Sequence, residues 1–258
     1  MNDLKEYYNK LYTDGKEKYW NDLKDSKDGL GKSHHFIIDD LAGRKFKPMS
    51  MLDFGCGEGD FLEYFHGLAK RVGIDFSEVA IAHAKARGSK VTYVLGAEEA
   101  VKGTYDFITS VGVLEHVEHP QKTFRCLYKA LNQGGLMYLV CPSHYNIRGV
   151  IWQALNVLLN VPMSLADRHV ISLADIKAWV GRDAAQVNFG TIDPDVVMGD
   201  DMIRDLNKRL TNALLDAKLD NTKVPEFLTW LKEAKHHFTV NGDNGCEAVY
   251  VIKKSEVT

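Results

Sequence analysis

The chain has 258 residues, of which 45% are hydrophobic and 26% charged, and its formal net charge is −3. This length suits one α/β domain with accessory segments. The nearly balanced charge does not indicate the basic surface that a nucleic-acid-binding protein needs. No stretch reaches 18 apolar residues and the polar N-terminus is unlike a signal peptide, so we expect a cytoplasmic protein without a transmembrane segment. The four cysteines are far apart, which disfavours a zinc site or a disulfide framework.

Residues 1–45 are expected to form an N-terminal helical arm, with a helix over residues 32–44 leading to the first strand. The beginning of this arm is polar but rich in aromatic side chains. These rings either anchor the arm on the domain or close over a ligand, because an aromatic face attracts a sulfonium cation. The candidates for closing over a cofactor are Tyr12, Tyr19 and Trp20, and of these we select Tyr19 as a cofactor contact.

A glycine loop follows the first predicted strand and organises the rest of the chain. Residues 49–54 are apolar and read as a buried strand, Gly55, Gly57 and Gly59 follow, and a helix is expected from Asp60. A strand, a glycine turn and a helix bring backbone N–H groups up to a ligand. The third glycine comes one residue too early for a dinucleotide fingerprint. The loop therefore argues against a nicotinamide-dependent dehydrogenase.

Two acidic residues narrow the class of ligand. Asp53 lies just before the glycines, where a carboxylate would repel a pyrophosphate but suits a cationic group. Asp75 ends the next predicted strand, where an acid is well placed to accept the hydroxyls of a ribose. The ligand should be a nucleoside with a cationic, amino-acid-like end and no phosphate, a description that S-adenosylmethionine fits. A plain glycine turn, or a non-catalytic protein that binds a nucleoside, remains the alternative.

The remaining pattern predicts a parallel sheet with helices on both faces, because strands and helices alternate with short links. Strands are expected at residues 72–75, 91–95, 105–110, 136–140, 185–192 and 248–252, and helices at residues 60–70, 78–87, 120–131 and 173–180. Ligands bind along the carboxyl ends of parallel strands, which makes Ala97 and Glu98 candidates to border an adenine.

Three segments divide the chain around this sheet. Residues 49–142 are expected to form the cofactor-binding core, residues 143–180 a lid over the substrate, and residues 194–235 a helical insertion. The apolar segment 147–161 is interpreted as part of the lid. Its alternative role is peripheral contact with a membrane or uptake of a lipid-like substrate.

The order of motifs resembles that of the class I S-adenosylmethionine-dependent methyltransferases. The matching stretch is Leu-Asp-Phe-Gly-Cys-Gly-Glu-Gly (52–59), Gly-Ile-Asp-Phe-Ser (73–77), Gly-Ala-Glu-Glu (96–99), Tyr-Asp-Phe-Ile (105–108), Val-Leu-Glu-His-Val (113–117) and Leu-Asn-Gln-Gly-Gly (131–135). The resemblance implies a Rossmann-like fold, with a doubly wound, mostly parallel seven-stranded sheet whose last strand is antiparallel, and S-adenosylmethionine as the cofactor. It implies these cofactor contacts: Gly55, Cys56 and Gly57 in the glycine loop, Asp53 beneath it, Asp75 at the ribose, Phe76, Ala97 and Glu98 at the adenine, and Val111 facing the cofactor.

A looser similarity to the small-molecule O-methyltransferases of ubiquinone biosynthesis extends beyond this core. It rests on the Leu-Glu-His-Val-x-x-Pro segment, the apolar helix after the fifth strand and a histidine before the next helix. The insertion at 194–235 departs from that pattern. We therefore expect methyl transfer to a small molecule, most simply to a hydroxyl group, while an N- or C-methyltransferase acting on a metabolite or a sugar remains the alternative.

Methylation of a hydroxyl group needs a base, and histidine serves best near neutral pH. The candidates are His169 and His144, which lie where the lid should meet the substrate, and His116 after the fourth strand. No cluster of His, Asp or Glu has metal-ligand spacing in the sequence, so no metal site is expected.

Overall fold

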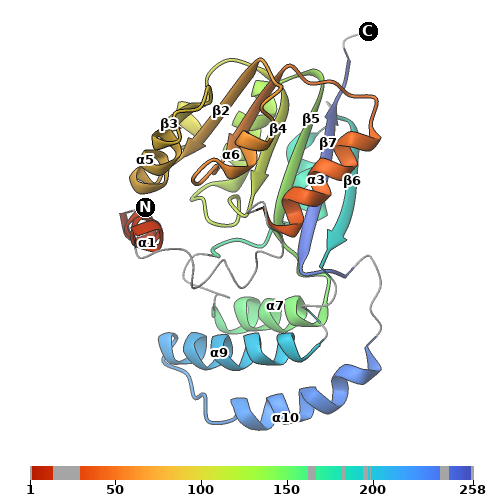
Figure 1. The fold of residues 1–258 in the computed structure, drawn as a ribbon. Coiled ribbons are helices and arrows are strands. Elements are labelled where there is room, and N and C mark those ends of the chain that lie inside the picture. Colours follow the sequence, from red (N-terminus) through yellow and green to blue (C-terminus); the bar gives the residue numbers. More distant parts are fainter. Residues whose placement is uncertain are drawn as a thin grey trace.

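The fold was examined in a computed structural model, which describes residues 2–13, 30–161, 167–181, 184–193, 197, 199–238 and 244–256. A seven-stranded sheet with the strand order β3-β2-β1-β4-β5-β7-β6 lies at its centre (Figure 1). The strands are β1 (Ser50–Phe54), β2 (Lys70–Asp75), β3 (Thr92–Leu95), β4 (Tyr105–Val111), β5 (Leu131–Pro142), β6 (Ala184–Ile192) and β7 (Glu247–Lys254). β7 is antiparallel to both of its neighbours, whereas β1 to β5 pair in parallel. The predicted Rossmann-like sheet with an antiparallel last strand is confirmed.

Helices connect these strands and cover both faces of the sheet (Figure 1). They are α1 (Asn2–Thr13), α3 (Lys32–Gly43), α4 (Asp60–Tyr64), α5 (Glu78–Ala86), α6 (Pro120–Ala130), α7 (Ile147–Leu159), α8 (Leu173–Val180), α9 (Asp200–Asp216) and α10 (Val224–Ala234). The helix expected over residues 60–70 is shorter than predicted, because α4 ends at Tyr64 and β2 already begins at Lys70. None of the helices in the described ranges is long and apolar enough to span a bilayer.

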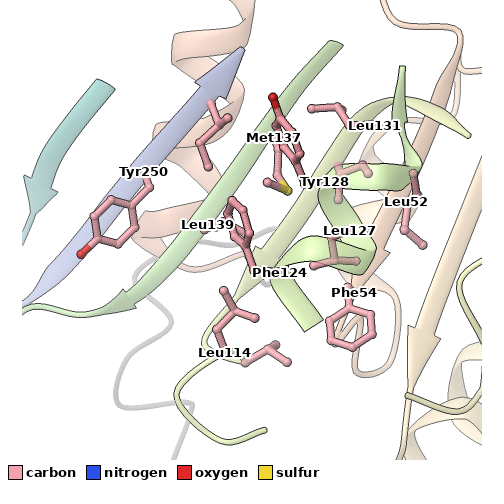
Figure 2. Close-up of a cluster of buried hydrophobic side chains, with 14 of the residues drawn as sticks. Leu52, Phe54, Leu114, Phe124, Leu127, Tyr128, Leu131, Met137, Leu139 and Tyr250 are labelled. Atoms are coloured by element: carbon pink, nitrogen blue, oxygen red, sulfur yellow. The ribbon is translucent and has the colours of Figure 1, made fainter. Parts of the chain in front are cut away.

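Alternating side chains of the strands fill two separate cores, one on each face of the sheet. In β1, Leu52 and Phe54 belong to one cluster, while Met51 belongs to the other. This follows from the two-residue period of a strand. Figure 2 shows Leu52 and Phe54 with Leu127 and Phe124 of α6, which packs over that face. The two cores hold the carboxyl ends of β1, β2 and β4 at one edge of the sheet.

A third core lies below that edge, within the layer formed by α7, α9 and α10 (Figure 1). Its buried residues are Trp152, Met202, Ile203, Leu206, Leu210, Val224, Leu228 and Leu231. Arg148 at the start of α7 donates to Asp205 of α9 over 2.7 Å, and Arg209 donates to the other oxygen of the same carboxylate. The two described helices of the predicted insertion, α9 and α10, therefore pack with α7 in a core of their own.

Candidate functional site

The glycine loop after β1 is fastened to the end of β2 by hydrogen bonds. The N–H of Gly55 donates to the carbonyl of Ile74 over 2.7 Å. The N–H of Gly57 donates to Oδ2 of Asp75 over 2.9 Å, and the other oxygen of Asp75 accepts from the N–H of Ser77 over 2.8 Å. Gly57 has a φ of 53°, which lies in the left-handed region that favours glycine. Asp75 therefore joins the loop to the start of α5.

Asp53 lies beneath this loop and is only 4% exposed. Its Oδ1 accepts a hydrogen bond from the hydroxyl of Thr109 over 2.7 Å. Burial raises the pKa of Asp53 to about 7, and the charge of Asp75 adds to that rise while the Thr109 hydrogen bond opposes it. Both expected roles of Asp53, orienting the loop and contacting a cofactor, stay predictions.

The side chains of α1 lie over the glycine loop and the end of β2. The hydroxyl of Tyr12 is 2.8 Å from the position that a Cβ atom on Gly57 would take. The ring of Tyr8 packs edge-on against Phe76, with 5.4 Å between centroids, and lies 5.9 Å from the ring of His116. Tyr8 and Tyr12 are one helical turn apart, so they share a face of α1. Tyr8 was not among the residues that the sequence singled out, although this spacing could have identified it.

Polar contacts anchor α1 on α5. The hydroxyl of Ser77, the residue that caps α5, donates to the side-chain oxygen of Asn9 over 2.8 Å. Lys5 forms an ion pair with Glu78 over 2.6 Å. The first helix is therefore held beside the predicted ribose site. The selected contact Tyr19, and Trp20 with it, lie outside the described residues.

The residues expected near the adenine lie after β3. The N–H of Ala97 donates to the carboxylate of Glu99 over 2.9 Å, and Glu98 pairs with Lys122 over 2.9 Å. The Lys122 ammonium lowers the pKa of Glu98 through a hydrogen bond, although partial burial acts in the opposite direction. Glu98 therefore has a cationic partner on α6, and its contact with an adenine stays a prediction.

Two further cofactor candidates have packing roles in this structure. Cys56 is buried, and its thiol lies 3.6 Å from the carbonyl of Gly57 within the loop. Val111 is half-buried at the end of β4 and packs against the cluster that contains Cys56. Both lie at the edge where β1 and β4 end, as the sequence pattern predicted.

His116 lies between two carboxylates just beyond β4. Its Nδ1 is 3.4 Å from Oδ1 of Asp167, and its Nε2 is 3.7 Å from Oε1 of Glu115. The backbone carbonyl of Glu115 accepts hydrogen bonds from the N–H groups of Arg168, over 2.9 Å, and His169, over 3.1 Å. These two bonds hold the segment from Asp167 to His169 against the loop that follows β4, more than fifty residues earlier in the sequence.

Glu115 is 2% exposed, and its Oε2 has no hydrogen-bond partner among the described residues. Burial raises its pKa to about 7, and the neighbouring His116 opposes this rise. The ligand atoms of Glu115, His116 and Asp167 all lie within 4.8 Å of one another, so the group could hold a metal ion. Residue spacing could not reveal this group, because Asp167 comes from a distant segment. The expectation of no metal site stays a prediction.

The other two histidine candidates share a small cavity between α7 and the segment that follows it. The cavity has a volume of about 20 Å³ and is lined by His144, Trp152, Asn156, Asp167, Arg168, His169 and Val170. Burial lowers the pKa of His144, which keeps its ring neutral at pH 7. Asp167 lines this cavity and also faces His116, so the three histidine candidates gather around one carboxylate.

Comparisons with known proteins agree with this arrangement. A family described as a methyltransferase domain matches residues 34–182. The ubiquinone biosynthesis O-methyltransferase of Parvibaculum lavamentivorans is 35% identical over 115 residues, which cover 42% of this chain and 46% of that protein. The chain thus matches about half the length of that relative.

Solved structures share the fold. The plantazolicin methyltransferase BpumL, in complex with a pentazolic desmethylPZN analog and SAH, is 17% identical, covers 99% of this chain and 98% of its own, and has a TM-score of 0.55. A possible histamine N-methyltransferase from Thermotoga maritima is 11% identical, covers 98% of this chain and 100% of its own, and has a TM-score of 0.61.

Proposed function

The chain belongs to the methyltransferase domain family, and from this premise we propose that it transfers the methyl group of S-adenosylmethionine to a hydroxyl group of a small molecule. The family match confirms the methyltransferase class, and with it the cofactor, that the sequence motifs predicted. The cofactor would lie along the ends of β1, β2 and β3, with its ribose at Asp75. The proposed division of the chain follows: residues 49–142 hold the cofactor, while residues 143–180 and 194–235 shape the acceptor side.

The reaction is an in-line displacement at the methyl carbon. An acceptor oxygen forms the new O–C bond, the C–S bond breaks, and S-adenosylhomocysteine leaves as the sulfur regains its electron pair. The enzyme holds the acceptor in line and takes up its proton. We propose that His116 takes up the proton of the acceptor hydroxyl and that Asp167 orients the ring of His116. His144 and His169 remain on the acceptor side as binding residues.

One observation supports this choice of base. Carboxyl oxygens of Asp167 and Glu115 face the two ring nitrogens of His116, at 3.4 and 3.7 Å, and so hold the orientation of the ring. The ring of Tyr8 links His116 to Phe76 at the expected adenine site. Burial lowers the pKa of His144, which makes this ring a weaker base than a free imidazole.

The test is a two-stage experiment on the purified protein. Calorimetry measures binding of S-adenosylmethionine, S-adenosylhomocysteine and NAD, with Asp75→Ala as the variant that should lose binding of both sulfur nucleosides. Release of S-adenosylhomocysteine is then followed in a screen of phenols and aliphatic alcohols, with and without EDTA. His116→Gln should lower kcat at least a hundredfold and leave cofactor affinity within twofold. Binding of NAD alone would sink the proposal, and loss of activity in EDTA would assign Glu115, His116 and Asp167 to a metal.

The same carboxylates favour one alternative acceptor, an amine. Glu115 and Asp167 could hold an ammonium group beside His116, and the ring of Tyr8 would add a cation–π contact. An amine acceptor needs less help from a base than a hydroxyl does. Methylated amines among the products, with a loss of affinity for the amine in Asp167→Asn, would favour N-methylation over O-methylation.

Contact with a membrane surface is a further proposal for α7. Its C-terminal end exposes Val157, Leu158 and Leu159, which are 73%, 76% and 52% exposed. An apolar acceptor that partitions into lipid could reach the site from this side. Sedimentation with vesicles, compared between the native chain and Leu158→Glu, tests this contact.

A further inference from the structure

The cavity between α7 and residues 167–170 contains buried polar atoms that the fold does not satisfy. Nε1 of Trp152 and Nδ1 of His144 are both buried, and neither has a hydrogen-bond partner in the part of the chain that the structure describes. Trp152 is only 1% exposed. Leaving a buried donor or acceptor unsatisfied is costly, so such atoms in a native protein usually bind water or a ligand.

The two nitrogens have opposite hydrogen-bonding characters. An indole N–H can only donate. Burial lowers the pKa of His144, although the backbone of Gly149 opposes this effect, so the imidazole is neutral at pH 7. We assign the ring proton to Nε2, which leaves Nδ1, the ring atom without a partner, with an acceptor lone pair. A hydroxyl group can accept from Trp152 and donate to His144 at the same time, whereas an ether or a carbonyl oxygen can do only the first.

The geometry of the chain keeps both rings in place. A Cβ atom on Gly149 would lie 2.3 Å from the Cα of His144, so glycine at this position lets the segment approach α7 closely. The side chain of Asn146 caps α7 by accepting from the N–H of Gly149 over 2.8 Å. Trp152 is fixed from the other side by the core that α7 shares with α9. The cavity of about 20 Å³ exceeds the roughly 10–15 Å³ that one water molecule needs.

We propose that Trp152 and His144 form a hydroxyl-binding subsite for the methyl acceptor, across Asp167 from His116. The inference rests on the proposed function, because it assigns the subsite to the acceptor. Without an acceptor, one water molecule satisfies both nitrogens. A hydroxyl group of the acceptor displaces this water and reproduces its two hydrogen bonds, while an ether in the same place leaves His144 without a donor. The two residues thereby select for a hydroxyl group at this position.

The test observes the indole N–H of Trp152 directly by NMR. The chain has four tryptophans, and ¹⁵N-tryptophan labelling with Trp152→Phe as a reference assigns the signal of interest. The protein, saturated with S-adenosylhomocysteine, is titrated with phenol, resorcinol and anisole. Phenol and resorcinol should shift the Trp152 signal saturably, and anisole should bind about tenfold more weakly. The signal of Trp230, which is 56% exposed on α10, serves as an internal control and should not move.

Two variants separate the subsite from a structural role. His144→Phe should abolish the preference for phenol over anisole, and His144→Gln should restore part of it, because the amide oxygen again accepts a hydrogen bond. Thermal melting of both variants checks that they are folded. Equal shifts with anisole, or no shift with either hydroxylated probe, would overturn the proposal. A shift without methyl transfer to any acceptor would leave the subsite standing and refute the proposed reaction instead.

Discussion

At the scale of single residues, the site is defined by carboxylates held in unusual surroundings. Asp53 and Glu115 are 4% and 2% exposed, and burial raises the pKa of each to about 7. Asp75 differs because two backbone N–H groups bind its carboxylate. The candidate cofactor site therefore has one acid that is fixed by the backbone, and a second whose charge depends on pH near neutrality.

The buried carboxyl of Asp53 should make stability depend on pH. The unfolded chain releases this proton near pH 3.8, whereas the folded protein keeps it up to about pH 7. The folded state therefore binds more protons between these values, and the stability contributed by this group falls as the pH rises through that window. Above pH 7 the carboxyl is ionised in both states, and the free-energy cost of burying its charge no longer changes with pH.

Asp53→Asn removes this penalty and can still accept the hydrogen bond from Thr109. We expect the variant to melt at a higher temperature than the native chain at pH 8 and at nearly the same temperature at pH 5. Melting curves followed by circular dichroism measure the difference. The exposed Glu118→Gln is the control and should change the melting temperature by a small and equal amount at both pH values. A stabilisation by Asp53→Asn that is greater at pH 5 would contradict the assignment.

At the scale of elements, α1 is the segment that closes the candidate cofactor site. It is joined to α5 through Asn9 and Lys5, and its Tyr12 lies over Gly57. Burial raises the pKa of Tyr12 well above its usual value, so the phenol stays neutral and its ring face remains available to a sulfonium. A cofactor bound on the glycine loop would then be covered by this ring.

Replacing Tyr12 with alanine should speed release of the cofactor product. We expect Tyr12→Ala to raise the dissociation rate constant of S-adenosylhomocysteine about tenfold, because it removes the aromatic cover above Gly57. Stopped-flow displacement measures the rate. Tyr64→Ala is a matched control, since Tyr64 lies on α4 and is 48% exposed. An unchanged rate in Tyr12→Ala would mean that α1 does not cover the bound cofactor.

At the scale of the whole molecule, the proposed acceptor side and the candidate cofactor site rest on different cores. The two clusters that flank the sheet position the glycine loop, whereas α7, α9 and α10 form a third cluster of their own. Trp152 belongs to this third cluster and also lines the cavity beside His144. The helical insertion therefore supports α7, and through it the proposed acceptor side.

A cavity in the third core should weaken the acceptor side while sparing the cofactor site. Leu206 is fully buried on α9, and Leu206→Ala should lower the free energy of unfolding by about 2–5 kcal/mol. Binding of S-adenosylhomocysteine should stay within twofold of the native chain, since the glycine loop rests on the other two cores. Urea denaturation and calorimetry measure the two effects. Leu215→Ala, at a 56% exposed position of the same helix, should cost less than about 0.5 kcal/mol.

The sequence by itself determined the sheet and its cofactor edge. Glycines at alternate positions, Asp53 and Asp75 are local signals, because a strand, a turn and an acid at the next strand end follow from neighbouring residues and from the two-residue period of a strand. The same local patterns placed β6 and β7 and predicted that the insertion is helical, whereas its division into α9 and α10 came from the structure.

Only the tertiary structure decided which residues share the acceptor side. Asp167 meets His116 because two backbone hydrogen bonds to Glu115 join segments more than fifty positions apart, and no spacing in the chain encodes that approach. Trp152 faces both the third core and the cavity for the same reason, since α7 acquires its partners from α9 and α10. Sequence periodicity fixes which face of an element is apolar, whereas packing between distant elements fixes which polar groups meet.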